Sequence, residues 1–278
     1  MAGVRDATPP VRVACAQLAP VFGDLDGNAE RALAAIREAA GRGAGVVVLP
    51  ELALSGYVFE SVEEARSLCV SPAAVAAWGD HGPVVVGGFG ELGAGGELFN
   101  SAAIVDGDGV RAVYRKAHLW DREPAFFTPG AEPPLVVETA AGRIGAMVCY
   151  DAFFPEWVRI AALRGAELLC VPGNWPRREH PEGEPPFQAH RARVAAEANG
   201  IAVALCDRAG SERGAAFAGA STIAGPDGAL LARAAAPEPE LVVADVDLAA
   251  VPADHRAGAL SQRRPELYGP LAAPTAPV

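Results

Sequence analysis

Two kinds of apolar pattern divide the chain. Short apolar runs rich in β-branched residues predict strands, and longer stretches with apolar residues at helical spacing predict helices. The predicted helices cover residues 27–41, 61–78, 155–165 and 186–199. The predicted strands cover residues 11–18, 45–50, 83–89, 101–106, 109–115, 143–149, 167–172, 201–206, 221–225 and 241–246.

The order of these elements predicts the α/β class. Strands such as 45–50 and 83–89 are almost continuously apolar, which is typical of sheets covered by helices. A strand, a helix and a strand follow each other at the start of the chain and again over 143–172, whereas the run 98–115 resembles an antiparallel hairpin. We therefore expect a mixed sheet, or two stacked sheets with helices outside.

Length and composition favour one domain with a large core. Of the 278 residues, 51% are hydrophobic and 21% are charged, which excludes a disordered chain and a coiled-coil rod. We expect a flexible segment over residues 1–10 and a single domain over residues 11–251. Residues 252–278 are rich in proline and glycine, and we expect this tail to be an arm that contacts another subunit.

The net charge of −11 limits the partners of the protein. Such a charge repels nucleic-acid phosphates and anionic membrane surfaces, so neither is an expected partner. No stretch approaches the ~18 apolar residues of a membrane span, and the N-terminus lacks the pattern of a secretory signal. The sequence therefore predicts a cytoplasmic location.

Lysine is almost absent from the chain. Of the 23 basic residues, Lys116 is the one lysine and all others are arginine. Replacement of lysine by arginine in a GC-rich genome explains the arginines but not the exception. Because a compact ammonium on a flexible stem is not interchangeable with a guanidinium, Lys116 is a candidate functional residue. Chance survival is the alternative.

The cysteines form neither a disulfide pattern nor a metal pattern. They are five in number and far apart, without a CxxC pair or a Cys/His cluster at zinc spacing. Cys15, Cys170 and Cys206 lie inside apolar runs, where cysteine is most often a small core residue. We therefore expect no disulfide framework and no structural metal.

Three predicted strands each lead into a chemically reactive residue. VVVLP precedes Glu51, VYR precedes Lys116 and GAMV precedes Cys149. Because sites in α/β sheets form at the carboxyl ends of strands, we expect these three residues to share a pocket. Taken singly, each has a structural alternative, as a turn cap, a solvated charge or a core thiol.

An acid, a base and a thiol together suit nucleophilic catalysis. A thiol near its ordinary pKa is mostly protonated at neutral pH and needs a neighbouring base or positive charge, and Glu51 and Lys116 offer one of each. When the thiolate of Cys149 attacks a carboxamide carbon, negative charge develops on oxygen. Lys116 and the backbone N–H of Tyr150 are the candidate donors to that oxygen.

These residues lie in segments that resemble the nitrilase superfamily of carbon–nitrogen hydrolases. The segment CYDAFFPE around Cys149 is highly specific, and the match covers nearly the whole chain. The resemblance implies an α-β-β-α sandwich, a triad of Glu51, Lys116 and Cys149, and neither a metal nor an organic cofactor. The other matching segments are VACAQL, PELALSGY, YRKAHLWDRE, FFTPG, GNW and RRPELY.

The resemblance also implies roles for residues around the triad. Glu123 occupies the place of a second family glutamate and is expected to orient Lys116 or to take part in proton transfer, unless it pairs with a neighbouring arginine or caps a turn. Asn174 and Trp175 are expected to line the pocket beside the thiol. Trp120 could give one wall an aromatic surface, with packing under a loop as the alternative.

The reaction implied by the resemblance is hydrolysis of a small carboxamide to a carboxylate and ammonia through a Cys149 thioester. Nitriles and N-carbamoyl amides are alternative substrates for the same triad, and the sequence does not separate them. Members of the superfamily usually associate through the helix after the cysteine and through C-terminal arms. We therefore expect a homodimer or a higher even oligomer.

Two functions outside this class are the alternatives. His118 lies close to Lys116 in the sequence and suggests a cysteine peptidase, although the residues around Cys149 do not match papain-like enzymes. A non-catalytic oligomeric scaffold would be indicated by a broken triad, whereas all three triad residues are present.

The loop over residues 176–187 carries both signs of charge. If it overhangs the pocket, Arg177 or Arg178 would bind a substrate carboxylate, or its glutamates would bind an amine or a guanidinium group. A solvated loop is the alternative. The glutamates concerned are Glu179, Glu182 and Glu184.

Overall fold

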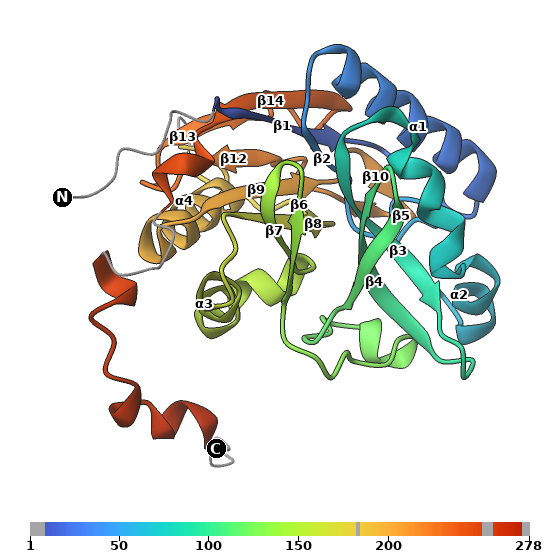
Figure 1. The fold of residues 1–278 in the computed structure, drawn as a ribbon. Helices are drawn as coiled ribbons and strands as arrows, with labels where there is room; N and C mark the ends of the chain where they lie inside the picture. Colours follow the sequence, from blue (N-terminus) through green and yellow to red (C-terminus); the bar gives the residue numbers. More distant parts are fainter. Residues whose placement is uncertain (1–8, 182–183, 252–257, 274–278) are drawn as a thin grey trace.

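Two six-stranded sheets lie face to face in the middle of the molecule (Figure 1). The computed structural model describes residues 9–181, 184–251 and 258–273, so most of segment 1–10 and parts of the tail lie outside the described residues. The first sheet has the order β14-β1-β2-β3-β4-β5. Its strands are β1 (Val11–Gln17), β2 (Val46–Val48), β3 (Val84–Leu92), β4 (Leu98–Asp106), β5 (Gly109–Arg115) and β14 (Glu240–Val246).

The second sheet has the order β13-β12-β9-β8-β7-β6. In both sheets the central strands are parallel and the outer ones antiparallel, so each sheet is mixed. A separate short hairpin joins β10 (Ser211–Glu212) to β11 (Ala215–Ala216). The strands of the second sheet are β6 (Leu135–Thr139), β7 (Gly142–Ala146), β8 (Leu168–Gly173), β9 (Ala202–Asp207), β12 (Thr222–Ala224) and β13 (Leu230–Arg233).

Alternate residues of β1 face two different layers. Val13 and Cys15 belong to the core shared with the second sheet, whereas Ala14 and Ala16 pack with α1 (Leu25–Gly41). This alternation follows from the pleat of a strand, because successive side chains point to opposite faces. The core between the sheets and the core under the helices are therefore built from the same strands.

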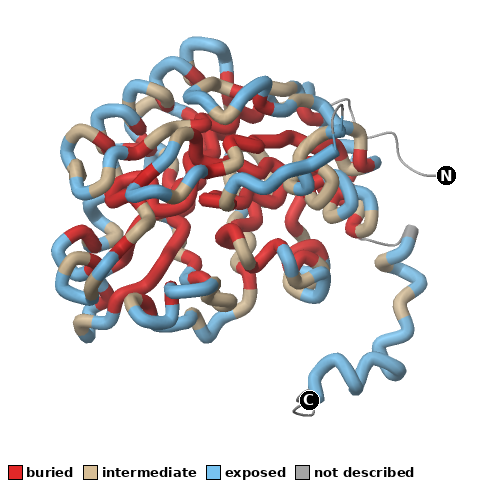
Figure 2. Tube along the Cα trace, turned by 180° about the vertical axis from the view of Figure 1, so that it is seen from behind, coloured by how far each residue is buried: buried red, intermediate tan, exposed pale blue. Residues whose placement is uncertain are grey.

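Helices cover the outer face of each sheet (Figure 1). The first sheet is covered by α1, α2 (Val62–Leu68) and the 3₁₀ helix η1 (Pro72–His81), and the second by α3 (Pro155–Leu163) and α4 (Phe187–Asn199). The buried residues concentrate in the middle of the molecule (Figure 2). The α-β-β-α sandwich is thereby confirmed.

Several predicted boundaries were wrong. The helix predicted over 61–78 is interrupted by an extended segment before Pro72, because the residue before a proline is disfavoured in the helical region. The strand predicted over 143–149 ends at Ala146, and β6 and β13 were not predicted. These two strands are the opposite edge strands of the second sheet; they are only partly buried, and their apolar runs are short.

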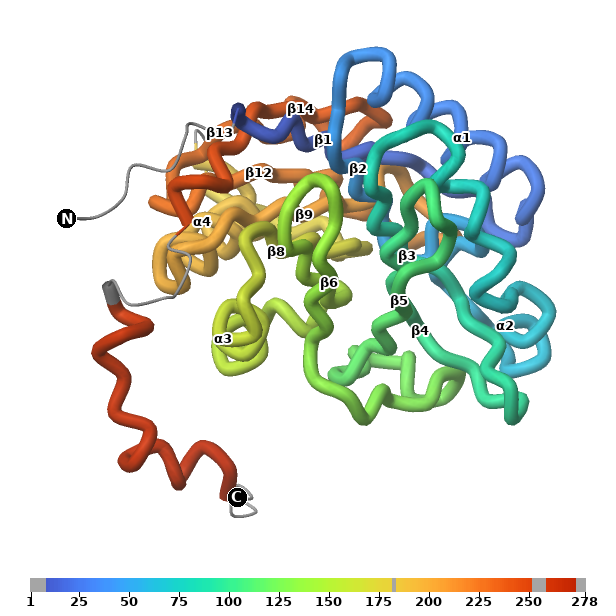
Figure 3. The backbone as a smooth tube through the Cα atoms, in the orientation of Figure 1, coloured from blue at the N-terminus to red at the C-terminus, as the bar shows by residue number. Residues whose placement is uncertain are grey.

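The described part of the tail begins against α4, where Leu260 packs on the core, and then extends away from the two sheets (Figure 3). It consists of three short 3₁₀ turns, of which the last two expose Leu267, Tyr268 and Leu271 to solvent. Among the described residues, no helix is both long enough and apolar enough to cross a bilayer.

Candidate active site

The ends of three strands bring Glu51, Lys116 and Cys149 into one site. Glu51 follows β2 and Lys116 follows β5, both in the first sheet, whereas Cys149 follows β7 in the second. The backbone N–H of Glu51 donates to the carbonyl of Gly173 at the end of β8, at 3.4 Å, and this hydrogen bond links the two sheets beside the site. The predicted convergence at strand ends is thus what the structure shows.

Lys116 lies between two carboxylates. Its Nζ is 2.7 Å from Glu51 Oε1 and 2.7 Å from Glu123 Oε1, and its side chain has no solvent exposure. Asn100 Nδ2 also donates to Glu51 Oε1, at 2.7 Å. Burial alone would lower the pKa of Lys116, but the two carboxylates outweigh burial and raise it above its ordinary value. Lys116 is therefore a fixed positive charge inside the site.

Glu123 is held on both of its oxygens. Oε1 accepts hydrogen bonds from Lys116 Nζ and from the Tyr57 hydroxyl, each at 2.7 Å, and Oε2 accepts the backbone N–H of Trp120 at 3.1 Å. Burial and the negative charge of Glu51 raise the pKa of Glu123, whereas Lys116 lowers it. The net pKa of Glu123 is above its ordinary value. The geometry suits a residue that orients Lys116. Glu123 also caps the turn at Trp120.

One oxygen of Glu51 is left for chemistry. Among the described residues, Glu51 Oε2 has no hydrogen-bond partner although it is buried. An unpaired buried carboxylate oxygen is costly, so its retention points to an acceptor for a proton or for a bound ligand. Gly88 makes this placement possible, because a Cβ there would lie 2.5 Å from the Glu51 Cα.

Cys149 opens the short 3₁₀ helix η3 (Cys149–Phe153) in a left-handed backbone conformation, with φ of 46°. Such a conformation is uncommon outside glycine and needs support from its surroundings. Asp151 supplies that support, because its Oδ2 accepts the backbone N–H of Val148 at 3.1 Å and the Tyr114 hydroxyl at 2.7 Å. The turn that presents the thiol is therefore anchored by a buried carboxylate.

The surroundings of the Cys149 thiol keep it protonated until a base acts. Burial and the charge of Glu51 raise the pKa of Cys149, while Lys116 and a hydrogen bond from the Asn174 backbone N–H lower it. The net pKa is well above that of a free thiol. Attack by the sulfur therefore requires transfer of its proton to a neighbouring acceptor, and Glu51 is the nearby carboxylate with a free oxygen.

Two residues that the sequence did not suggest hold the Tyr57 loop. Glu212 accepts the backbone N–H of Tyr57 at 2.8 Å and that of Val58, and its other oxygen pairs with buried Arg208 at 2.9 Å. Because the Tyr57 hydroxyl donates to Glu123, this pair positions the second carboxylate of Lys116 indirectly. No local pattern signals the contact, since Tyr57 and Glu212 are 155 residues apart.

Asp207 holds the other side of the site. Its carboxylate is buried and accepts the backbone N–H groups of Trp175 at 2.9 Å, Arg208 at 3.0 Å and Ala220 at 3.1 Å. Burial raises the pKa of Asp207 to about 7, although the three backbone donors lower it. This residue was not predicted either, and it fixes the segment that carries Asn174 and Trp175.

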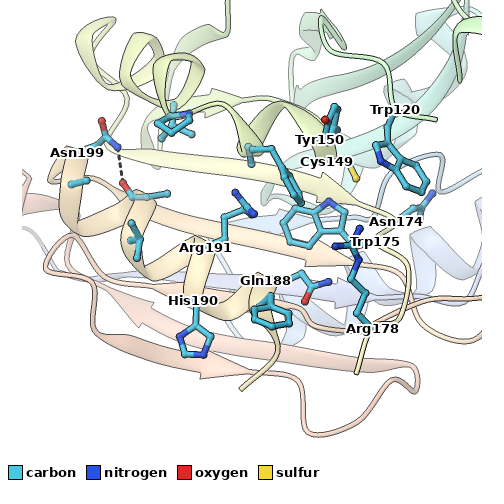
Figure 4. A pocket seen from close by; sticks show the side chains of 18 of the residues that line it. Trp120, Cys149, Tyr150, Asn174, Trp175, Arg178, Gln188, His190, Arg191 and Asn199 are labelled. Atoms are coloured by element: carbon cyan, nitrogen blue, oxygen red, sulfur yellow. Dashed lines mark hydrogen bonds between the residues drawn. The ribbon is translucent and has the colours of Figure 1, made fainter. Parts of the chain in front are cut away.

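A cavity of about 710 Å³ opens beside the thiol (Figure 4). Both polar atoms of the Asn174 side chain and the Trp175 indole nitrogen are buried there without partners among the described residues. Each is a hydrogen-bonding group available to a ligand. All four residues predicted to bind substrate line this cavity, namely Trp120, Tyr150, Asn174 and Trp175.

His118 faces a different partner from the one that a peptidase needs. Its Nδ1 is 2.7 Å from Asp151 Oδ1, and its ring stacks on Phe154 with centroids 3.8 Å apart. The electrostatic neighbours of the Cys149 thiol are instead Glu51, Lys116 and Glu123. The geometry therefore does not support a Cys149–His118 pair.

The charged loop contributes an arginine to the cavity. Arg178 lines it, whereas Arg177, Glu179 and Glu184 are not among its lining residues, and Glu182 lies outside the described residues. In the portion of the chain that the structure describes, no group of three or more His, Cys, Asp and Glu side chains is arranged to hold a metal ion.

Comparison with known proteins agrees with this geometry. A family model described as carbon–nitrogen hydrolase matches residues 12–256. A nitrilase of Pyrococcus abyssi is 36% identical over 245 residues, covering 86% of this chain and 90% of the relative. An N-carbamoylputrescine amidase of Solanum tuberosum is 32% identical and covers 88% of this chain and 89% of its own length.

Solved structures lead to the same family. The crystal structure of an amidase from a Nesterenkonia species has a TM-score of 0.80 at 28% identity and covers 98% of this chain and 100% of that one. Mutants of a Nesterenkonia amidase hold butyramide, or carry the acetamide moiety of fluoroacetamide covalently on the active-site cysteine. The chain described here belongs to the carbon–nitrogen hydrolase family of the nitrilase superfamily and is an amidase-type hydrolase.

Proposed function

We propose that this enzyme hydrolyses a carboxamide to a carboxylate and ammonia through a thioester on Cys149, with Glu51 as the base and Lys116 as the charged donor. The observation that carries the proposal is the buried free oxygen of Glu51 beside a thiol with a raised pKa. A base with a free lone pair and a protonated thiol form the starting state of nucleophilic catalysis.

In the first half of the reaction, Glu51 takes the thiol proton as the sulfur bonds to the amide carbon. The carbonyl oxygen becomes an oxyanion, which Lys116 Nζ and the Tyr150 backbone N–H stabilise as preorganised donors. The proton on Glu51 passes to the amide nitrogen, the C–N bond breaks and ammonia leaves. The acyl group stays on Cys149 as a thioester.

In the second half, water replaces ammonia. Glu51 takes a proton from the water as its oxygen attacks the thioester carbon, and the same donors meet the second oxyanion. The C–S bond then breaks, the sulfur of Cys149 recovers a proton from Glu51, and the carboxylic acid is released.

Glu123 acts in this scheme as a positioning residue. Both of its oxygens already accept hydrogen bonds, from Lys116 and Tyr57 on one side and from Trp120 on the other. Its carboxylate fixes the direction of the Lys116 ammonium and has no free oxygen for a reacting proton. Of the two roles expected from the sequence, orientation of Lys116 is the better supported.

Nitriles and N-carbamoyl amides are the alternative substrate classes, because a nitrilase and N-carbamoylputrescine amidases are among the relatives. A nitrile would follow a related path through a thioimidate on Cys149. The unpartnered Asn174 amide supports a substrate that has both a carbonyl and an N–H group, and this favours an amide over a nitrile.

The test is ammonia release from matched carboxamides, N-carbamoyl amino acids and nitriles, with the wild type and with Cys149→Ala. We expect ammonia from carboxamides, and its loss in the variant. Trapping of an acyl adduct on Cys149 by mass spectrometry distinguishes the thioester from direct attack by water. Ammonia release that persists in Cys149→Ala would contradict the proposal.

We also propose that the protein forms a homodimer or a higher even oligomer through the face that carries α3 and α4. Leu163 at the end of α3 is an exposed large apolar residue of that face, and Phe187 and Val194 on α4 are exposed where they line the cavity. The tail carries a second exposed apolar set. A monomer in light scattering at micromolar concentration would contradict this oligomer.

A further inference from the structure

The cavity beside Cys149 carries positive charge without a matching negative charge. Arg178 enters it from the loop after β8, and Arg191 enters from α4 (Figure 4). Arg159 of α3 also lines it, and its buried Nη1 has no hydrogen-bond partner among the described residues. None of the described lining residues is an aspartate or a glutamate. In a chain with a net charge of −11, such a lining is unexpected.

Arg191 is the arginine best placed to act on a substrate. It is half-buried, and its Cζ lies 3.5 Å from the centroid of the Phe153 ring. That ring in turn contacts Tyr150, the residue after the nucleophile, and Trp175, with centroids 5.1 and 6.0 Å apart. The guanidinium is therefore one aromatic layer away from residues that border the thiol.

The stacked position leaves the hydrogen-bonding edge of Arg191 available. A guanidinium that lies over a ring uses its face for the cation–π contact and keeps its N–H donors in the plane. Within the described residues, no hydrogen bond or ion pair engages these donors. Such a planar fork matches a carboxylate in bidentate geometry.

The free protein holds these charges at a cost. Burial and the positive charge of Arg178 both lower the pKa of Arg191, which means that its surroundings disfavour its charged form. A buried charge is normally paired. An anion that entered the cavity would relieve both effects at once.

We infer that the substrate of Cys149 is an amide that carries an anionic group, a carboxylate, at the end opposite the amide, and that Arg191 with Arg178 binds this group. The inference rests on the proposed amidase function, because Cys149 supplies the reacting end of the cavity. The aromatic wall of Phe153 and Trp175 between the two ends suits a short apolar spacer.

The experiment compares kcat/KM for three matched series of amides: the monoamides of malonic, succinic, glutaric and adipic acids, their neutral methyl esters, and the corresponding ω-amino amides. We expect the acids to exceed the esters by about tenfold or more, as the loss of a hydrogen bond to a charged group predicts, and the amino amides to be poorest. The preferred acid length reports the reach from Cys149 to Arg191.

The variants assign this preference to one residue. Arg191→Gln should bring the ratio of acid to ester close to one, and Arg191→Lys should give an intermediate ratio. Arg193→Gln is the matched control, because it removes the same charge two residues away on α4, where Arg193 donates to Gly228 instead of lining the cavity. Its ratio should equal that of the wild type.

A binding measurement separates this inference from the proposed function. Calorimetric titration of glutarate into Cys149→Ala should show binding that Arg191→Gln weakens about tenfold or more in the double variant.

Hydrolysis of esters and acids at equal rates, without glutarate binding, would overturn the anionic substrate and leave the amidase function intact. Glutarate binding that depends on Arg191, with no ammonia from any amide, would overturn the function and leave the anion site standing. If Arg191→Gln instead dissociates an oligomer and does not change the ratio, Arg191 binds a partner carboxylate and the inference is wrong.

Discussion

Positive charge is held in opposite ways next to the Cys149 thiol, the reacting end, and in the part of the cavity that Arg191 lines, the far end. At the reacting end, Lys116 is fully buried and contacts two carboxylates at 2.7 Å. At the far end, Arg191 is half-buried, stacks on Phe153 and has no carboxylate partner among the described residues. The first charge is neutralised when the chain folds, whereas the second remains for a ligand.

The difference between Lys116 and Arg191 shows which charge matters for folding and which for binding. Removal of one member of a buried ion pair leaves an uncompensated charge and costs much stability, whereas an unpaired charge contributes little to the folded state. The reacting end should therefore respond to mutation through stability and rate together. The far end should respond through substrate preference alone.

The largest expected effect is at Lys116. Lys116→Met leaves Glu51 and Glu123 buried without a counter-charge, so we expect the free energy of unfolding in urea to fall by about 3–5 kcal/mol. Arg12→Met is the control, because Arg12 pairs with Asp245 on the surface at 2.8 Å, where solvent screens the two charges and the pair adds little stability. Equal losses of unfolding free energy in the two variants would contradict this difference between the buried and the surface ion pair.

The next effect concerns the pH dependence of the rate. Because the pKa of Glu123 is raised, activity should fall with decreasing pH at a higher pH than an ordinary glutamate would give, as protonation removes one partner of Lys116. The Tyr57 hydroxyl lowers that pKa, so Tyr57→Phe should move this acid limb to higher pH, with kcat reduced about tenfold. Glu123→Gln should remove the limb. Unchanged pH profiles in both variants would argue against the orienting role.

A third effect is expected at Asp207. Its pKa is about 7 in the folded protein and near 3.8 in the unfolded chain, so the folded state binds this proton more tightly and stability falls as pH rises through this range. The stability advantage of the wild type over Asp207→Asn should therefore shrink from about pH 4 to about pH 7, as measured by thermal unfolding.

Asp245→Asn is the control, because its effect on stability should change with pH in the opposite direction. Arg12 lowers the pKa of Asp245, so its contribution to stability is present above the unfolded pKa and is lost as the pH falls through the folded pKa. The advantage of the wild type over this variant should grow as the pH rises. Parallel curves for the two variants would contradict the assignment of the Asp207 proton.

The smallest expected effect is on stability at Arg191. Arg191→Gln removes a cation–π contact with Phe153 but also a repulsion from Arg178, so the free energy of unfolding should change by about 1 kcal/mol or less. Urea denaturation beside Lys116→Met measures the contrast directly. A loss as large as that of Lys116→Met would show that Arg191 is paired within the folded chain.

Local sequence was sufficient to predict that Glu51, Lys116 and Cys149 come together, because each residue lies within three residues of the end of a strand. The runs before Glu51 and Cys149 are apolar, and the run before Lys116 places valine and tyrosine between arginines; both patterns are typical of strands. The boundaries were less accurate where structure depends on neighbours. The half-buried strand β6 is paired only with β7 on one side, and its own residues carry a weak signal.

The supporting residues could not be predicted because their roles come from contacts across the fold. Glu212 acts on Tyr57 from the β10–β11 hairpin, and Asp207 acts on Trp175 from the end of β9. Arg191 lies on a helix whose pattern resembles that of any surface helix. That pattern does not indicate that the Arg191 side chain faces a cavity and not bulk solvent.

The pairing of β14 with β1 has a consequence for synthesis of the protein. Val11–Gln17 of β1 pair along their whole length with Glu240–Val246 of β14, the last strand of the first sheet to leave the ribosome. Until residue 246 has emerged, β1 keeps an uncovered edge in a sheet that carries two of the three reactive side chains. A nascent chain therefore exposes an aggregation-prone edge for almost the whole time of translation.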